Sequence, residues 1–196
     1  IVPVEISNRV EYDRAQADLI RWLQETKGAA KADAARRAEQ LVRINSLKQL
    51  AARGKMAAVL EWVEDFLAGG SKLVIAAWHH EILDLLVSKF GCKKIDGTVP
   101  PVNRQPIVDD FQNNEKTKLI ALQLKVIGIT LTAASNVACI ELGWNPPTMD
   151  QLEDRCHRIG QTDSGRAWWF IGRKTIDEDI AQLIDKKRKL IDAVAD

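Results

Sequence analysis

From residue 72 onward, short apolar runs alternate with segments of helical pattern, and this alternation limits the possible folds most strongly. The runs lie at residues 73–77, 119–122, 137–140 and 168–171. Helical patterns lie between them at 81–89, 102–111 and 148–159. Near-continuous apolar strands separated by helices are typical of a parallel sheet that is covered on both faces. The sequence therefore predicts an α/β sandwich of the doubly wound type.

The first 70 residues have a different pattern, because their apolar residues recur at helical spacing. Helices are expected at 12–24, 29–53 and 55–67, and Gly69-Gly70 ends the last of these. Another helix is expected at 177–193. The chain of 196 residues is long enough for one domain with a full core. We expect a single domain made of an N-terminal helical region (residues 1–70), an α/β core (residues 71–175) and a closing helix (residues 176–196).

Composition excludes several classes of protein. No apolar run approaches the roughly 18 residues that span a bilayer, so no membrane segment is expected. The three cysteines form no C-x-x-C pair, and their odd number argues against a disulfide framework or a zinc ribbon. We therefore expect a reducing compartment. Three scattered histidines without an acidic cluster predict no metal site.

Basic residues are concentrated in one stretch although the net charge is only +1. Between Lys27 and Lys55 lie eight Lys or Arg residues, and only Asp33 and Glu39 oppose them. Such a stretch either faces phosphate or forms the solvated face of a helix. Charge alone leaves both interpretations open.

The segment 148–161, TMDQLEDRCHRIGQ, carries the strongest indication of chemistry. Thr148 followed by Gln151 forms a capping box, which predicts the start of a helix, and Gly160 is expected to end it. In that helix Gln151, Arg155 and Arg158 fall within about 60° of one another. Two guanidiniums on one helix face can bind phosphate or stabilise a phosphoryl group during transfer. Alternatively, the two arginines are surface residues paired with nearby acidic side chains.

The sequence QLEDRCHRIGQ resembles the Q-x-E-D-R-x-H-R-I-G-Q signature of Swi/Snf-type ATPases, which is helicase motif six. Upstream, ITLTAASNVACIELGWNP is similar to motif five of the same family, and KLVIAAWHH to motif four. KKIDGTVPPVNRQPIVDDFQ resembles the segment between motifs four and five, and IDEDIAQLIDKKRKLID the closing brace helix. The resemblance covers nearly the whole chain and is weakest in residues 1–45. It is greater to the annealing-helicase-like branch than to nucleosome remodellers, which usually show G-x-G-L-N-L where I-G-I-T-L stands here.

The resemblance implies the C-terminal RecA-like lobe of such an ATPase, a three-layer sandwich. In the family, two motif six arginines reach the phosphates of ATP, which the other lobe holds with Mg²⁺. Arg155 and Arg158 match them, and Gln151 matches the glutamine that orders that face. Gly128 matches the retained glycine of motif five, which lies between nucleotide and DNA.

The resemblance also implies contacts with the phosphates of double-stranded DNA. Gly97 and Thr98 match a turn that touches the tracking strand. Arg104 matches a spaced arginine that either binds phosphate or pairs with Asp109 or Asp110. Motif five reaches to Thr132, which is a further candidate. The small residues usual in that motif are replaced here by Lys125, Val126 and Ile127, so Lys125 is expected to contact phosphate through its side chain. His79 and His80 are expected to shape a turn or to face DNA.

Two motifs that ATP hydrolysis needs are absent from the 196 residues. There is no G-x-x-x-x-G-K-[ST] loop, because 69–72 lacks the G-K-[ST] order. The acidic run 177–179 opens a helix and does not follow an apolar strand. We therefore expect an N-terminal RecA-like lobe elsewhere in the polypeptide, a monomeric protein, and no ATP hydrolysis by this lobe alone. A compact lobe favours a prokaryotic or phage source with a cytoplasmic or nucleoid location, whereas a eukaryotic protein would be nuclear.

Two other functions stay open at this point. The chain could be a nucleic-acid-binding domain without a motor partner, or a non-catalytic α/β interaction module whose arginines form salt bridges. The length of the motif six match favours the motor lobe. The departures in motif five leave room for the first alternative.

Overall fold

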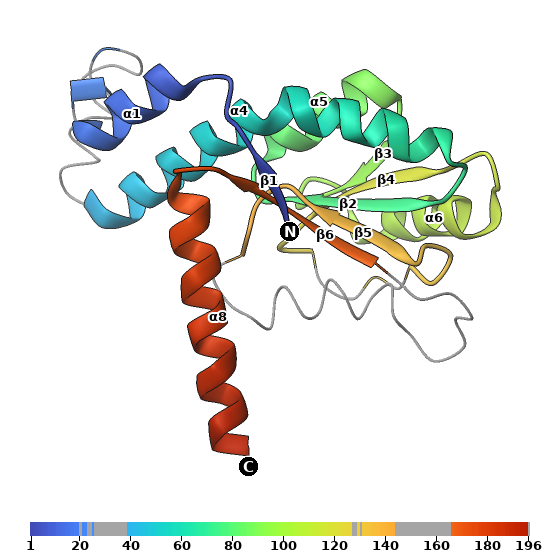
Figure 1. The fold of residues 1–196 in the computed structure, drawn as a ribbon. Helices are drawn as coiled ribbons and strands as arrows, with labels where there is room; N and C mark the ends of the chain where they lie inside the picture. The colour runs from blue at the N-terminus through green and yellow to red at the C-terminus, as the bar shows by residue number, and fades with distance from the viewer. Residues whose placement is uncertain are drawn as a thin grey trace.

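A computed structural model describes residues 1–19, 21–22, 25, 39–126, 129, 131–143 and 166–195. Its helices and strands are labelled in Figure 1. They are β1 (Val2–Val4), α1 (Arg9–Ala17), α4 (Glu39–Ala68), β2 (Leu73–Ala77), α5 (His80–Phe90), β3 (Lys93–Ile95), α6 (Pro101–Asn113), β4 (Leu119–Gln123), β5 (Asn136–Cys139), β6 (Arg166–Gly172) and α8 (Ile176–Ala195).

The six described strands form one sheet in the order β1-β6-β5-β2-β4-β3, and every pairing among them is parallel. Strand β2 lies inside the sheet, where Leu73 pairs with both Leu119 and Asn136. The chain passes from β2 to β3 on one side and from β5 to β6 on the other. The connections therefore diverge between β2 and β5, and α/β proteins place their ligands at the carboxyl ends of such strands.

Helices cover both faces of the sheet and create a three-layer structure (Figure 1). Side chains alternate between the two faces along β2. Ile75 belongs to one core cluster with Val59 of α4 and residues of α5, whereas Val74 belongs to a second cluster with Phe111 of α6 and Ile180 of α8. All five residues of β2 are buried. This explains the continuous apolar run and confirms the predicted α/β sandwich.

An aromatic cluster joins α4 to β6 on the face of the sheet that α4 covers. Trp62 packs against Phe170 with ring centroids 5.1 Å apart, and against Trp168 at 5.2 Å. Phe66 stacks on the same indole at 5.2 Å. Aromatic pairs at these separations contribute about 0.5–1.5 kcal/mol beyond the area that they bury.

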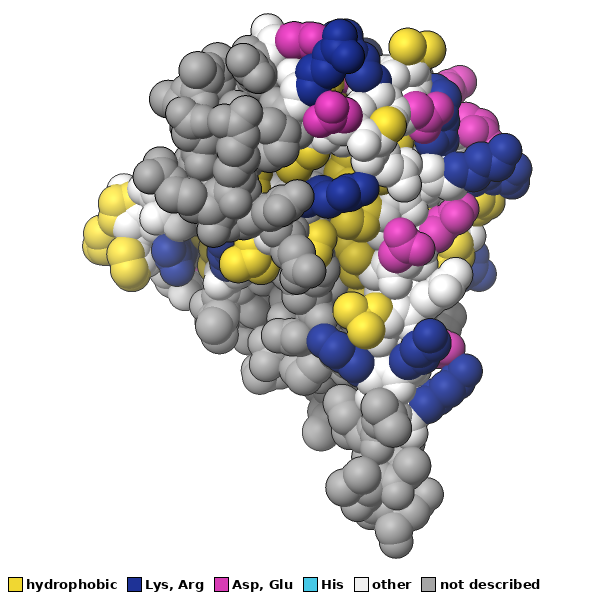
Figure 2. Space-filling model, turned by 90° about the vertical axis from the view of Figure 1, so that its left-hand side faces the viewer, with side chains coloured by type: hydrophobic (Ala, Val, Ile, Leu, Met, Phe, Trp, Pro, Cys, Tyr) yellow, Lys and Arg dark blue, Asp and Glu magenta, His cyan; other side chains and the backbone are white. Residues whose placement is uncertain are grey.

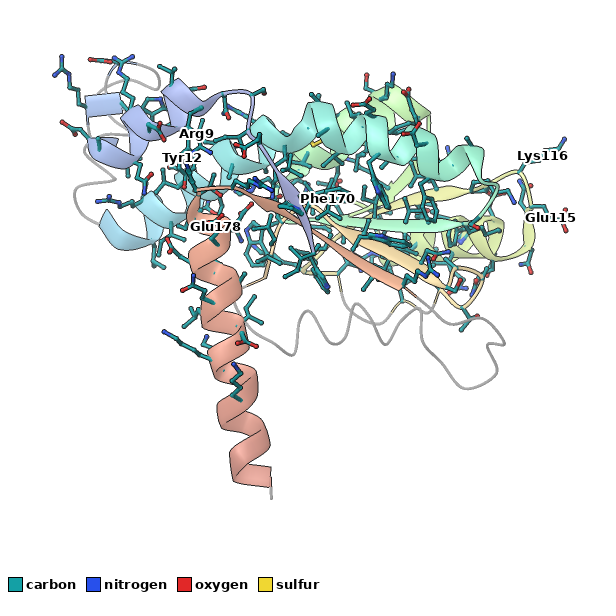
Figure 3. All side chains as sticks on the ribbon, viewed as in Figure 1. Arg9, Tyr12, Glu115, Lys116, Phe170 and Glu178 are labelled. Atoms are coloured by element: carbon teal, nitrogen blue, oxygen red, sulfur yellow. The ribbon has the colours of Figure 1, made fainter. Side chains whose placement is uncertain are left out.

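The start of α8 is fixed to the N-terminal residues, and its distal end projects from the body (Figure 1). Tyr12 is fully buried, and its hydroxyl accepts a hydrogen bond of 2.6 Å from the Ile176 backbone N–H. Burial raises the pKa of Tyr12 to about 12. Arg9 donates to the Lys174 carbonyl at 2.8 Å (Figure 3). Along α8, Figure 2 shows a group of basic side chains, where Lys186 and Lys189 are exposed.

The structure departs from the sequence-based expectations at two short strands and two helical regions. The helix expected at 12–24 is interrupted, because α1 ends at Ala17 and Asp18, whose backbone is not helical, follows as its C-cap. Strand β1 lies inside the region that is predicted to be helical, pairs with β6, and tolerates Pro3 because it lies at the edge of the sheet. Strand β3 is not predicted by the sequence, because three residues with two lysines give no apolar run. The expected helices 29–53 and 55–67 are continuous within the described residues, since α4 passes through Gly54.

Candidate functional site

Polar side chains gather at the carboxyl edge of the sheet, where four neighbouring strands end. Glu141 follows β5, Gln123 ends β4, and Asp96 follows β3. All three are buried, with exposed fractions of 1%, 7% and 0%. The segment Trp78-His79-His80 follows β2 and lies among them. Buried polar groups need hydrogen-bond partners, and these side chains find most of theirs in one another and in the backbone.

Glu141 joins the end of β5 to the end of β2. One carboxylate oxygen accepts the backbone N–H groups of Trp78 at 2.8 Å and His79 at 2.9 Å. The other lies 2.5 Å from His79 Nδ1. Burial alone would raise the pKa of Glu141, but its hydrogen bonds and charge interaction with His79 outweigh burial and lower it. A buried carboxylate therefore stays ionised and holds the two strand ends together.

Gln123 connects three strand ends through one side-chain amide. Its Oε1 accepts the Gly97 N–H at 3.1 Å, which links β4 to the turn after β3. Its Nε2 lies 3.2 Å from the Trp78 carbonyl and 3.1 Å from His80 Nε2. The amide thereby bridges the predicted DNA-contacting turn and the end of the central strand β2.

Asp96 organises the turn that carries Gly97 and Thr98. Its Oδ1 accepts the Thr98 backbone N–H at 2.9 Å and the Thr98 hydroxyl at 2.5 Å. Its Oδ2 accepts His80 Nδ1–H at 3.0 Å and lies 2.9 Å from Lys94 Nζ. Burial works to raise the pKa of Asp96, but the bonds from Thr98 and Lys94, with that from His80, hold it well below its usual value. Gly97 and Thr98 themselves are exposed, so hydrogen bonds to the buried Asp96 carboxylate hold the turn from the protein side while its outer surface faces solvent.

Two lysines of α4 are buried beneath the same edge. Lys48, 1% exposed, donates to the Leu142 carbonyl at 2.7 Å just beyond β5. Lys55, 0% exposed, donates to the carbonyls of Ile140 and Phe170 and to Asp177 Oδ2 at 2.6 Å. Both interpretations of the basic stretch 27–55 are therefore wrong for these two residues, which face neither phosphate nor solvent. They fix the end of β5 against α4 and α8.

Two other basic residues of that stretch also have partners within the protein. Arg53 binds Glu81 of α5, with Nε 2.8 Å from Oε1. Arg43 donates to the Gln16 carbonyl at 2.8 Å. Lys27, Lys31, Arg36 and Arg37 lie outside the described residues. The four described basic residues of this segment, Arg43, Lys48, Arg53 and Lys55, therefore stabilise the fold.

The Trp78 ring is contacted by the ammonium groups of two lysines from different segments. Lys48 Nζ lies 4.8 Å from the ring centroid and Lys125 Nζ lies 4.3 Å from it. Lys125 follows β4 and is exposed, so its ammonium stands at the solvent side of the carboxyl edge. This cation–π contact, worth about 0.5–1 kcal/mol at an exposed site, orients the lysine without neutralising it.

The structure brings three of the predicted DNA-binding residues to one edge of the sheet. Gly97, Thr98 and Lys125 follow the neighbouring strands β3 and β4. Arg104 lies in the first turns of α6, beside that turn, and its Nε donates to the Val99 carbonyl at 2.9 Å. The two acids proposed as its partners bind elsewhere: Asp109 accepts from Gln105 at 2.8 Å, and Asp110 from Asn114 at 2.9 Å.

Thr132 lies away from these residues. Its hydroxyl accepts a bond of 3.2 Å from Gln112, near the end of α6, and it precedes the amino end of β5. The amino and carboxyl ends of parallel strands lie at opposite edges of a sheet, so Thr132 is not grouped with Gly97. Gly128, Gln151, Arg155 and Arg158 lie outside the described residues.

Sequence reasoning missed Glu141, Gln123, Lys48 and Lys55. The first two had a signal, because a polar residue at the end of an apolar run marks the carboxyl edge of a parallel sheet. The lysines had another: positions 48, 52, 55 and 59 follow helical spacing, and Ala52 and Val59 are apolar and buried.

Other features of the described residues suggest no competing site. A hollow of about 220 Å³ between β6 and α8 is mainly apolar, and Asp185 is its one titratable lining residue among those described. In the same residues, no His, Cys, Asp or Glu side chains cluster in a way that could bind a metal. None of the described helices has the length and apolar character needed to cross a membrane.

Comparison with known proteins agrees with the fold. Residues 54–160 match the helicase conserved C-terminal domain. The SWI/SNF-related matrix-associated actin-dependent regulator of chromatin subfamily A-like protein 1 of Xenopus tropicalis is 34% identical over 71% of this chain and 16% of its own length. The homolog of that protein in Caenorhabditis elegans is 33% identical over 82% of the chain and 24% of its own length. Helicase swr1 of Aspergillus fumigatus is 32% identical over 72% of the chain and 9% of its own length.

Solved structures give the same result. The SWI2/SNF2 ATPase core of Sulfolobus solfataricus, solved in complex with double-stranded DNA, matches with a TM-score of 0.72 and 26% identity. That match covers 96% of this chain and 44% of the other. The C-terminal part of the Fun30 ATPase domain matches with a TM-score of 0.61 and 26% identity, over 68% of this chain and 46% of the other.

The chain spans between 9% and 24% of the length of the three curated relatives described above. These relatives are eukaryotic, which agrees with the nuclear location expected for a eukaryotic source. They give no support to the prokaryotic or phage source that compactness favoured. The matched region, the parallel sheet and the arrangement of strand ends lead to one conclusion. The chain belongs to the helicase conserved C-terminal domain family, as a C-terminal lobe of the Swi/Snf type.

Proposed function

We propose that this chain is the C-terminal motor lobe of a DNA-dependent ATPase that translocates on double-stranded DNA. Arg155 and Arg158 act as arginine fingers on the phosphates of ATP, and Gln151 orders their helix face. The nucleotide and its Mg²⁺ are held mainly by an N-terminal RecA-like lobe of the same polypeptide. Gly128 approaches the nucleotide, and Gly97, Thr98, Arg104 and Lys125 contact DNA phosphates. Thr132 extends that DNA contact only if the strand also reaches the opposite edge of the sheet.

One observation carries this proposal more than any other. The exposed turn Gly97-Thr98 and the exposed Lys125 stand together at the carboxyl edge, above the buried network of Asp96, Gln123 and Glu141. Backbone N–H groups, a hydroxyl and an ammonium bind phosphate oxygens without reading bases, which suits a protein that moves along DNA. The chain leaves this same edge after β5 and continues into the sequence that contains both candidate arginines.

The DNA contact is tested by the salt dependence of binding, measured on the full-length parent protein. The plot of log K against log salt has a negative slope, and each lost phosphate contact reduces the magnitude of that slope by about 0.9 for duplex DNA. We expect Lys125→Ala to reduce the magnitude of the slope by about this amount. The matched control is Lys116→Ala, because Lys116 is exposed at the turn after α6, far from the carboxyl edge (Figure 3). Equal slopes for the two variants would contradict the proposed DNA surface.

The incomplete motor is tested by assaying the 196-residue chain alone with Mg²⁺, ATP and double-stranded DNA. Phosphate release should stay at the level of buffer, because neither the G-x-x-x-x-G-K-[ST] loop nor the strand-linked Asp-Glu pair is present. The full-length parent should hydrolyse ATP, and DNA should stimulate it. DNA-stimulated turnover by the isolated chain would refute the proposed division of labour between two lobes.

A nucleic-acid-binding role without motor activity is favoured by one observation. Motif five has Lys125-Val126-Ile127 in place of small residues, and Val126 is buried. A full-length parent that binds duplex DNA but releases no phosphate in its presence would support this second function over the first.

A further inference from the structure

The side-chain amide of Gln123 has an orientation that the backbone around it determines. The Trp78 carbonyl can only accept a hydrogen bond, and it lies 3.2 Å from Nε2. The Gly97 N–H can only donate, and it lies 3.1 Å from Oε1. Rotating the amide by 180° would place oxygen against oxygen and N–H against N–H. Gln123 therefore presents its second N–H to His80.

This orientation defines the protonation state of His80 in the complete network. Nε2 of His80 lies 3.1 Å from Gln123 Nε2, so it must accept and cannot carry a proton. Nδ1 then carries the single proton and donates to Asp96 Oδ2 at 3.0 Å. An uncharged imidazole with its proton on Nδ1 satisfies both partners, since one ring nitrogen of neutral histidine donates and the other accepts.

We propose that Gln123 and uncharged His80 are positioning residues that hold the Asp96–Thr98 turn in its DNA-binding conformation. The inference deepens the proposed function and depends on it for the role of DNA. Gln123 holds the Gly97 N–H directly, and His80 holds both Gln123 and Asp96. The turn is thereby tied to the end of β2 through the Trp78 carbonyl, so it cannot move without breaking these bonds.

Protonation of His80 breaks one side of this arrangement. A proton on Nε2 would oppose the Gln123 N–H, whereas the bond from Nδ1 to Asp96 would persist in either state. A protonated imidazole therefore loses its bond with Gln123, whose bonds to the Gly97 N–H and the Trp78 carbonyl then lack the support of His80. The imidazole is 47% exposed, so protons can reach it. The charged or titratable groups around it are Asp96, Lys94 bound to Asp96, Asp84 of α5 bound to Lys94, and the neighbouring His79–Glu141 pair.

The network is tested directly by nitrogen-15 NMR of the imidazole and the Gly97 amide in the 196-residue chain. At about pH 7.5 we expect His80 to carry its proton on Nδ1. In His80→Leu the Gly97 amide resonance should shift, because the imidazole holds Gln123 and Gln123 holds the Gly97 N–H. A proton on Nε2 at about pH 7.5, or a Gly97 resonance indifferent to that substitution, would overturn the proposal.

Two variants separate positioning from general stability. His80→Gln keeps one donor for Asp96 and one acceptor for Gln123, whereas His80→Leu removes both bonds. In the full-length parent, duplex affinity should be near wild type for His80→Gln and about fivefold weaker for His80→Leu, the equivalent of one net hydrogen bond. Equal duplex affinities for His80→Gln and His80→Leu would overturn the role of His80.

The outcomes also separate this inference from the proposed function. If NMR shows the Nδ1–H imidazole and the coupled Gly97 amide, the network stands. If Thr98→Val and His80→Leu then leave DNA affinity unchanged, the DNA role of the turn fails, and the positioning proposal fails with it while the network remains. If Thr98→Val weakens binding and His80→Leu does not, the positioning proposal alone is refuted.

Discussion

Replacing Lys55 by Met removes a cation from a site that water does not reach. Lys55 is 0% exposed and Asp177 is 1% exposed, and Nζ lies 2.6 Å from the carboxylate. The ammonium also satisfies the carbonyls of Ile140, just after β5, and Phe170, within β6. Met has similar length and no charge, so the substitution leaves the packing volume nearly unchanged and removes the hydrogen bonds.

The cost follows from what remains buried. Asp177 keeps one bond from the Gly172 N–H at 2.9 Å but loses its counter-ion, and two carbonyls lose their donor. Breaking one side of a buried ion pair costs about 3–5 kcal/mol because an uncompensated charge is left in the interior. We therefore expect Lys55→Met to lower the free energy of unfolding by about 3–5 kcal/mol. Adding Asp177→Leu removes the stranded charge and should recover much of that loss.

The assay is equilibrium urea unfolding of the 196-residue chain at about pH 7, with the slope m compared between proteins. Lys89→Met is the matched control, since Lys89 forms an exposed pair with Glu64 at 2.6 Å with side chains 46% and 52% exposed. Exposed pairs are worth about 1 kcal/mol or less. If Lys55→Met and Lys89→Met destabilise equally, the buried pair does not hold the strand ends as described.

Three further predictions concern other regions of the structure. Gly54→Ala should destabilise by about 1–3 kcal/mol in urea unfolding, because a Cβ would lie 2.1 Å from Asn8 Oδ1; the stabilisation usual for Gly→Ala in a helix would contradict this. The pKa values of Asp96 and Glu141 are lowered in the folded protein, so the stability that they contribute is present above about pH 4 and declines as the pH falls below it. In Asp96→Asn the free energy of unfolding should therefore decline less steeply at acid pH. An unchanged decline would refute the assignment. Trp62→Ala should cost about 3 kcal/mol by thermal or urea unfolding, because the indole contacts three other rings; a loss below about 1 kcal/mol would show that the cluster is not cohesive.

The apolar runs at 73–77, 119–122, 137–140 and 168–171 predicted the buried strands because a parallel sheet covered on both faces leaves no polar position within a strand. The same reasoning could not find β1 and β3. Each has three residues and lies at an edge, where one neighbour and partial exposure impose no composition. The continuity of α4 through Gly54 was also hidden, because a glycine usually indicates an end and here allows close approach of Asn8 and Ile6.

The candidate site was predicted only incompletely. The turn at Gly97 and Thr98 was a candidate from family resemblance, and Lys125 was one from a departure from the family pattern. The structure shows that they share an edge. The buried network beneath them depends on which side chains meet across strands, which no local pattern encodes. Lys48 and Lys55 were counted as basic surface because a count of charges does not show which way each side chain points. Their position on the apolar stripe of α4, in register with Ala52 and Val59, was the only available signal.

The most direct test of the central claim is DNA-stimulated ATP hydrolysis by the full-length parent carrying Arg158→Ala. Loss of an arginine finger lowers kcat by about a thousandfold or more, because charge on the transferring phosphoryl group loses its stabilisation. Arg173→Ala is the control, since Arg173 is exposed and lies 3.6 Å from Glu5 in a surface pair. We expect ATP turnover to fall by about this factor in Arg158→Ala, with the fold and the duplex affinity unchanged, and to stay at the wild-type rate in Arg173→Ala. Unchanged turnover in a folded Arg158→Ala protein would contradict the account.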